Sequence, residues 1–115
     1  MIARIWKARA TPEHAVEYAA FLQSTVVPEL TAIHGYQGVT LLEHEQDGVV
    51  EVTVMTWWES LESIRAFAGD AVETAVVHDT AARMLMDFDR DVAHHQVVFD
   101  SRADHGGIKS DRRVL

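Results

Sequence analysis

The sequence has no cysteine, only two prolines and no long apolar run. Without cysteine the chain forms no disulfides, and thiol catalysis and thiolate metal sites are excluded. A membrane-spanning helix needs about 20 consecutive apolar residues. The opening stretch Met1 to Lys7 also lacks the order of a basic and then an apolar segment that marks a signal peptide. We therefore expect a soluble, cytoplasmic protein without membrane contacts.

Basic side chains are scarce as well. The 115 residues include 18 acidic and 10 basic side chains, so the formal net charge is -8. Binding to nucleic acid needs a basic face, and so does docking on anionic lipid, so we expect neither partner. The length and the 48% apolar content fit one globular domain. We assign this domain to residues 1–100. We expect residues 101–115, with their Gly-Gly pair and few apolar side chains, to form a flexible or dimer-crossing tail.

Four segments have the composition of strands. Residues 2–10 carry apolar side chains mainly at even positions, and residues 36–46 and 49–58 flank the pair Asp47-Gly48. An Asp-Gly pair between two such runs predicts a hairpin, because both turn positions need positive φ. Residues 92–99 are the last predicted strand.

Two helical regions separate these strands. Thr11-Pro12 is a typical helix start, and apolar residues then recur every three or four positions up to Ile33. We expect the helix to kink or restart at Pro28 and to end at Gly35. Ser60 caps a second helix that Gly69-Asp70 interrupts, and a further helical stretch is predicted over residues 71–86.

The resulting order is strand, helix, strand, strand, helix, strand. This order predicts an α+β, ferredoxin-like βαββαβ fold with an antiparallel sheet and both helices on one face. The other face of the sheet is left uncovered, although every strand has apolar or aromatic residues at both parities. An uncovered, partly apolar face needs a partner, and a second copy of the chain is the simplest one. We therefore expect a homodimer.

Three stretches carry a family resemblance: Met1 to Trp6, Trp57 to Gly69 and Val92 to Val98. The Trp58-Glu59-Ser60 junction is the most specific of them. The sequence resembles the antibiotic biosynthesis monooxygenase family, within the dimeric α+β barrel superfamily, over roughly residues 1–100. The resemblance implies a homodimeric barrel with one pocket per subunit between helices and sheet.

The resemblance also implies a chemistry. In the cofactor-free members the substrate is an electron-rich phenol or anthrone whose own carbanion reduces O₂, while the protein supplies an apolar cavity and a few polar groups. The predicted function is therefore a cofactor-independent monooxygenase that acts on a small aromatic or quinone-like molecule. The family also includes haem-degrading members and members with no known activity, so a haem- or hydrophobic-ligand-binding protein and a non-catalytic dimeric scaffold stay open as alternatives.

Two residues are candidates for catalysis. Arg4 lies among apolar neighbours on the first strand, where its guanidinium would hold a substrate oxyanion; the alternatives are a structural ion pair or a head group that reaches solvent at the sheet edge. His94 resembles a histidine that is common near the last strand of these relatives, and a histidine in a pocket can accept a proton near neutral pH. Its alternative is a hydrogen-bonded histidine at the dimer interface. Because His95 is adjacent on the same strand, it points to the opposite face, and the two cannot share one metal ion.

Aromatic and apolar side chains would line the pocket. Substrate-binding candidates are Trp6, Tyr18, Trp58, Phe67 and Met84, since large aromatics suit a flat ligand. Each of them is also an ordinary core residue.

His78 is the candidate for the haem alternative. In haem-degrading relatives a helix histidine at about this place coordinates iron, together with a strand asparagine and a helix tryptophan. Here Arg4 or Trp6 stands for the asparagine and Phe67 for the tryptophan, and both departures count against haem degradation. His78 is otherwise a solvent-exposed helix residue. The histidines show no paired ligand spacing, so we predict no other metal site.

Overall fold

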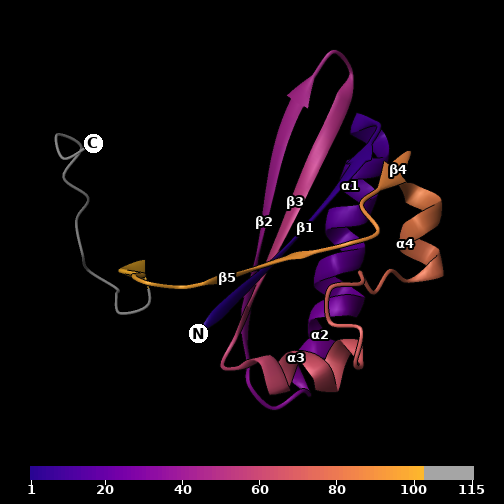
Figure 1. Cartoon of the computed structure of the whole chain (residues 1–115). Coiled ribbons are helices and arrows are strands. Elements are labelled where there is room, and N and C mark those ends of the chain that lie inside the picture. Colours follow the sequence, from indigo (N-terminus) through magenta and orange to yellow (C-terminus); the bar gives the residue numbers. More distant parts are fainter. Residues whose placement is uncertain (103–115) are drawn as a thin grey trace, which may run out of the picture.

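The computed structural model describes residues 1–102 and has one antiparallel sheet with helices on one side (Figure 1). The long strands are β1 (Ile2–Ala10), β2 (Tyr36–Gln46) and β3 (Val49–Trp58), in the order β2-β3-β1. The other edge of β1 pairs with two short strands, β4 (Asp87–Phe88) and β5 (Ala93–Gln96). The predicted ferredoxin-like α+β fold is confirmed, and the bounds of the first three strands match the predicted ones.

The first helical region runs as one column with a wide turn in it. Helix α1 (Pro12–Phe21) starts as predicted, with the Thr11 side chain accepting a hydrogen bond from the backbone of His14. It continues as the π-helical segment η1 (Leu22–Val26) and then as α2 (Val27–Thr31). The irregularity predicted at Pro28 therefore lies just before it, as a π turn that the Val27 amide closes on the Leu22 carbonyl.

The turn after α2 depends on glycine. The helix ends one turn earlier than predicted, and Gly35 lies in the turn that follows, with φ of +93°. A Cβ added there would lie 2.0 Å from Ser63 Oγ. The Gly35 carbonyl also accepts a hydrogen bond from the Glu59 amide, so the end of α2 closely approaches the start of α3.

The second helical region is shorter than predicted. Helix α3 (Leu61–Ala68) begins at Ser60, whose hydroxyl accepts the Ser63 amide, and α4 covers only Asp79–Met84. The predicted helix over residues 71–86 is therefore wrong for residues 71–78. Two backbone groups of this connecting segment form hydrogen bonds with residues outside it. The Ala75 amide donates to the Arg90 carbonyl, and the Glu73 carbonyl accepts from the Val92 amide. These tertiary hydrogen bonds replace the helical ones.

The last strand is shorter than predicted. In place of the predicted strand over residues 92–99, the structure has β5, which ends at Gln96, and β4 is a further short strand that the sequence did not predict. Between β4 and β5, residues 90–92 leave β1 and run beside the 71–78 segment, where Thr74 and Asp91 form an isolated bridge. Both short strands pair with the same edge of β1.

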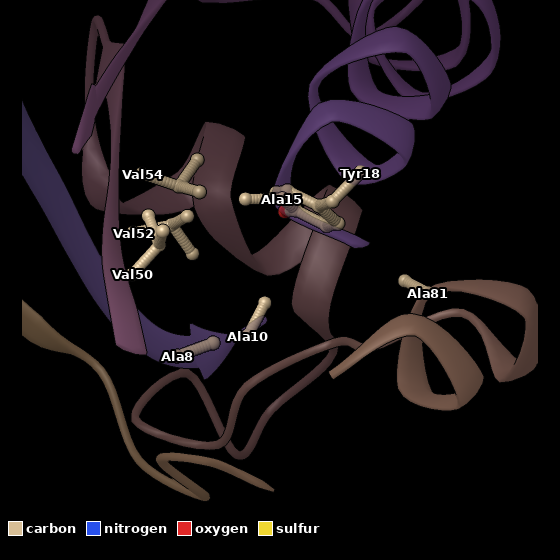
Figure 2. Close-up of a cluster of buried hydrophobic side chains, with 8 residues drawn as sticks. All are labelled: Ala8, Ala10, Ala15, Tyr18, Val50, Val52, Val54 and Ala81. Atoms are coloured by element: carbon tan, nitrogen blue, oxygen red, sulfur yellow. The ribbon is translucent and has the colours of Figure 1, made fainter. Parts of the chain in front are cut away.

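The core lies between the even-numbered face of the sheet and the helices. Figure 2 shows Val50, Val52 and Val54 of β3 on one side and Tyr18 of α1 on the other. A second cluster is formed by Trp58, Ile64, Leu30 and Val72. Since even positions face the helices, this is also the face from which the side chains of Arg4, Trp6 and His94 project.

The opposite face, called the odd-numbered face after its positions on β1 and β3, carries no helix in the part of the chain that the structure describes. Because β2 has a bulge between Tyr36 and Gly38, its even positions after the bulge lie on this face. The odd-numbered face displays Ile5, Met55 and Trp57, and Leu42 on it is 49% exposed. Arg102 lies over this face, with its guanidinium carbon 4.4 Å from the centre of the Trp57 ring. The homodimer predicted from this face stays a prediction, as does the domain boundary at residue 100. The predicted tail falls mostly on residues 103–115, outside the described residues. No helix within residues 1–102 is long and apolar enough to cross a membrane.

Candidate active site

A cavity of about 360 Å³ lies between the helical column and the sheet. One wall comes from α1, η1 and α2, the opposite wall from β1 and β3, and the 71–78 segment closes a third side. Its lining is mostly apolar and comprises Arg4, Trp6, Tyr18, Leu22, Val26, Glu29, Leu30, Ile33, Val54, Thr56, Phe67, Ala75, Val76, Val77, His78, Ala81 and Val92.

Arg4 is the buried cation of this cavity, with 4% of its surface exposed. Its Nη1 donates to the Val72 carbonyl and lies 2.9 Å from His94 Nε2, and its Nη2 donates to the Thr74 carbonyl at 2.9 Å. The guanidinium carbon is 5.6 Å from the centre of the Phe67 ring. Arg4 therefore fastens the 71–78 segment to β1 and β5.

The charge of Arg4 persists despite this burial. Burial lowers the pKa of the guanidinium, and the nearby carboxylate of Glu73 partly offsets this effect. Arginine starts from so high a pKa that it stays protonated. The guanidinium has five N–H groups, and three of them make the bonds above. The remaining two, on Nε and Nη2, have no acceptor within residues 1–102, and Arg4 lines the cavity.

His94 serves Arg4 rather than the cavity. Because Arg4 Nη1 can only donate, His94 Nε2 is the acceptor and the ring is neutral. Burial, followed by the charge of Arg4, lowers the pKa of His94 below its usual value near 6.5, Glu73 raises it slightly, and His95 lowers it. The lone pair needed by a general base is thus already engaged. His94 is not among the residues that line the cavity.

Three aromatic candidates do line the cavity: Trp6, Tyr18 and Phe67. Trp6 Nε1 donates to the Asp89 carbonyl at 2.7 Å, which fixes its ring, and the rings of Trp6 and Tyr18 are 6.3 Å apart. Tyr18 is 4% exposed, and burial raises its pKa to about 12. Its hydroxyl is therefore a neutral donor at any ordinary pH.

His78 lies at the mouth of the cavity, beside α4. Its Nε2 is 3.0 Å from Glu29 Oε2 of α2, and its ring meets the edge of Phe21. His78 and Glu29 both line the cavity, and both are exposed. Within residues 1–102, no three histidine or carboxylate side chains gather closely enough to hold a metal ion.

Trp58 and Met84 were predicted to bind substrate and lie elsewhere. Trp58 is fully buried beneath Phe67, and its Nε1 donates to Thr56 Oγ1. Met84 packs against the core cluster that contains Val50, Val52 and Val54. Neither lines the cavity, so their ligand contacts have no support in this geometry.

Sequence reasoning missed Thr56, Glu29 and the 75–77 segment. Thr56 occupies an even position of β3, as the core residues of that strand do, so the alternation could have placed it on the cavity side. The 75–77 segment gave no such signal, because its place depends on the hydrogen bonds of Arg4 and Arg90.

The sequence model of antibiotic biosynthesis monooxygenases matches residues 1–76 of this chain. The chain belongs to this family. The match ends within the segment that Arg4 fastens, so β1, β3, α3 and the helical column all lie inside it. No curated protein sequence matches the chain.

Solved structures share the fold of this chain. A protein of Bacillus cereus that is predicted to be an antibiotic biosynthesis monooxygenase is 15% identical, with a TM-score of 0.61 over 91% of this chain and 98% of that one. The monooxygenase ActVA-Orf6 of Streptomyces coelicolor, solved with nanaomycin D, is 15% identical, with a TM-score of 0.60 over 96% and 91%. The haem-degrader MhuD of Mycobacterium tuberculosis, solved with two haems, is 20% identical, with a TM-score of 0.56 over 87% and 98%. At these identities the likeness concerns the fold.

Proposed function

We propose that this chain is a cofactor-independent monooxygenase that oxidises a small aromatic or quinone-like molecule bound in the cavity. The observation that supports this proposal most directly is the combination of an apolar cavity bounded by aromatic rings with one buried cation on its wall. Apolar walls with a few placed polar groups are typical of sites for flat organic ligands.

The size of the cavity sets the size of the ligand. The volume of about 360 Å³ lies near the lower end of the range of small-molecule sites, roughly 300–1,000 Å³. This volume suits a small aromatic ligand.

The reaction needs no group besides substrate and O₂. For an anthrone, the ring CH₂ loses a proton, the resulting carbanion reduces O₂, and the hydroperoxide formed at that carbon loses water to leave a carbonyl. One O₂ is consumed, and one quinone and one water are formed. The protein must hold the anion and accept the proton.

Arg4 and the mouth of the cavity supply these two roles in our proposal. The two remaining N–H groups of Arg4 hold the substrate oxyanion, and the fixed positive charge favours it in a site with little water. His94 is the residue that positions Arg4, in place of the base first predicted. Glu29 accepts the Nε2 proton of His78, which leaves His78 Nδ1 to take the substrate proton.

Haem binding is the second candidate, since His78 does line the cavity. The geometry does not fit it. The Nε2 of His78, the atom that would bind iron, is engaged by Glu29. We therefore place no haem in the proposal.

The test is oxygen uptake with anthrone as substrate, corrected for its spontaneous oxidation with heat-inactivated protein. We expect one quinone formed for each O₂ consumed, a large loss of rate in H78N and E29Q, and an unchanged rate in H14N. His14 is an exposed histidine of α1 outside the cavity, so it is the matched control. Binding of anthrone without any uptake of O₂ would contradict the oxygenase and favour a non-catalytic binding protein.

We also propose that the partner of this chain is a second copy, seated on the odd-numbered face of the sheet. Ile5, Met55 and Trp57 give that face an apolar centre, and Leu42 stands exposed on it. A two-fold pair buries this surface on both copies at once.

A further inference from the structure

Among the residues that the structure describes, the buried hydroxyl of Tyr18 has no hydrogen-bond partner. Tyr18 projects from α1 toward the sheet, between that helix and the valines of β3 (Figure 2). It is 96% buried and lines the cavity, and no group within residues 1–102 forms a hydrogen bond with its hydroxyl. Buried hydroxyls in folded proteins nearly always have a partner, so an unpaired one in a cavity wall indicates that something in the cavity supplies it.

The other polar groups of this wall are already engaged. The Trp6 N–H donates to the Asp89 carbonyl, and Thr56 Oγ1 accepts from Trp58 while it donates weakly to the Arg4 carbonyl. Tyr18 is therefore the neutral donor of this wall that remains for a ligand, in the same cavity as the guanidinium of Arg4. Its pKa of about 12 keeps the proton on the hydroxyl.

A neutral donor surrounded by apolar side chains favours a neutral acceptor. A carboxylate or phosphate there would lose its hydration among valine, leucine and tryptophan side chains. A ketone or quinone oxygen loses little on entering such a site and accepts one hydrogen bond in the plane of the ring.

We infer that Tyr18 is a specificity-determining residue that selects ligands with a ring carbonyl by donating a hydrogen bond to that oxygen. The inference rests on the proposed function, because it names the substrate class of the same cavity: a flat aromatic ketone or quinone, with its carbonyl toward α1.

The experiment compares two ligands of the same shape in three proteins. Anthrone has a ring carbonyl, and 9,10-dihydroanthracene has a CH₂ in its place. Their affinities are measured by equilibrium dialysis under argon, so that no oxidation occurs, for the wild-type protein, Y18F and Y36F. Tyr36 packs against Trp58 and does not line the cavity, so Y36F is the matched control.

We expect the wild-type protein and Y36F to bind anthrone more than about tenfold more tightly than dihydroanthracene, because Tyr18 and Arg4 both donate to the carbonyl oxygen. Y18F should bind anthrone about tenfold less tightly than the wild type, the usual effect of one neutral hydrogen bond, and keep its affinity for dihydroanthracene. Ligand-free Y18F should be as stable as wild type or more stable, since it removes an unpaired hydroxyl. An affinity for anthrone that is unchanged in Y18F, no preference for anthrone in the wild type, or a destabilised Y18F would overturn the inference.

Failure of the proposed function gives a different result. If anthrone binds with the expected preference but O₂ uptake is absent, the oxygenase is wrong and the role of Tyr18 stands. If neither compound binds the wild-type protein, both proposals are wrong.

Discussion

Replacing Arg4 by methionine should loosen one part of the molecule and leave the rest intact. Methionine has a similar length and keeps the packing against Phe67, but it removes the donors to the Val72 and Thr74 carbonyls and to His94. An acceptor left without a partner in a buried site costs about 1–3 kcal/mol. The variant also no longer desolvates a buried cation, which offsets part of this loss.

We therefore expect R4M to lose about 2–3 kcal/mol of the free energy of unfolding, measured by urea denaturation. The loss of hydrogen bonds should first increase local opening of the 71–78 segment and of residues 90–92. Hydrogen exchange of the Ala75 and Val92 amides, which bond to Arg90 and Glu73, should speed up, while amides of the β2–β3 hairpin keep their protection.

R4K is the informative control. A lysine ammonium keeps the charge but lacks the planar fork that reaches two carbonyls and an imidazole, so its stability should fall between that of wild type and R4M. An R4M protein with wild-type stability and unchanged exchange at Ala75 and Val92 would refute the claim that Arg4 fastens this segment.

Three further predictions concern other parts of the fold. His94 has a lowered pKa in the folded protein, so below about pH 6.5 the unfolded chain takes up a proton that the folded chain does not. The free energy of unfolding therefore decreases as the pH is lowered. H94Q, whose amide oxygen still accepts from arginine, should lose less stability than the wild type between pH 7 and pH 5 in urea titrations. G35A should cost about 1–3 kcal/mol more than G48A, because both glycines have positive φ but only Gly35 would place a Cβ against a serine; equal thermal shifts would exclude the clash. L42E should convert a dimer to a monomer in sedimentation velocity, whereas V16E, on an exposed part of α1, should not; a monomeric wild type would contradict the proposed partner.

The sequence was informative where local chemistry determines structure. Alternation along β1 and β3, the Asp47-Gly48 turn and the caps at Thr11 and Ser60 act over a few residues, and each of them predicted its element correctly. The family assignment followed from the same local segments.

The errors lie where the chain is organised by distant partners. Residues 71–78 have a composition compatible with a helix, yet their backbone bonds to Arg4 and to the 90–92 segment. Arg4 and His94 were both predicted to belong to one site. The hydrogen bond between them changes the role of His94, and it could not be predicted because the two residues are 90 positions apart in the sequence.

The π turn at Leu22–Val26 determines which side chains of the helical column line the cavity. In a regular α-helix, residues spaced by four drift about 40° around the axis at each step, so Tyr18, Leu22, Val26 and Leu30 would wind away from the sheet. The wider turn, closed by the Val27 amide on the Leu22 carbonyl, takes up that drift and keeps all four on the cavity wall. The shape of the cavity thus depends on the number of residues in the helix as well as on their kind. Deleting a single residue such as Ser24 would convert the i→i−5 bond of this turn into an ordinary i→i−4 bond, so the column would continue as a regular α-helix and the cavity wall would lose the extra residue that the π turn accommodates.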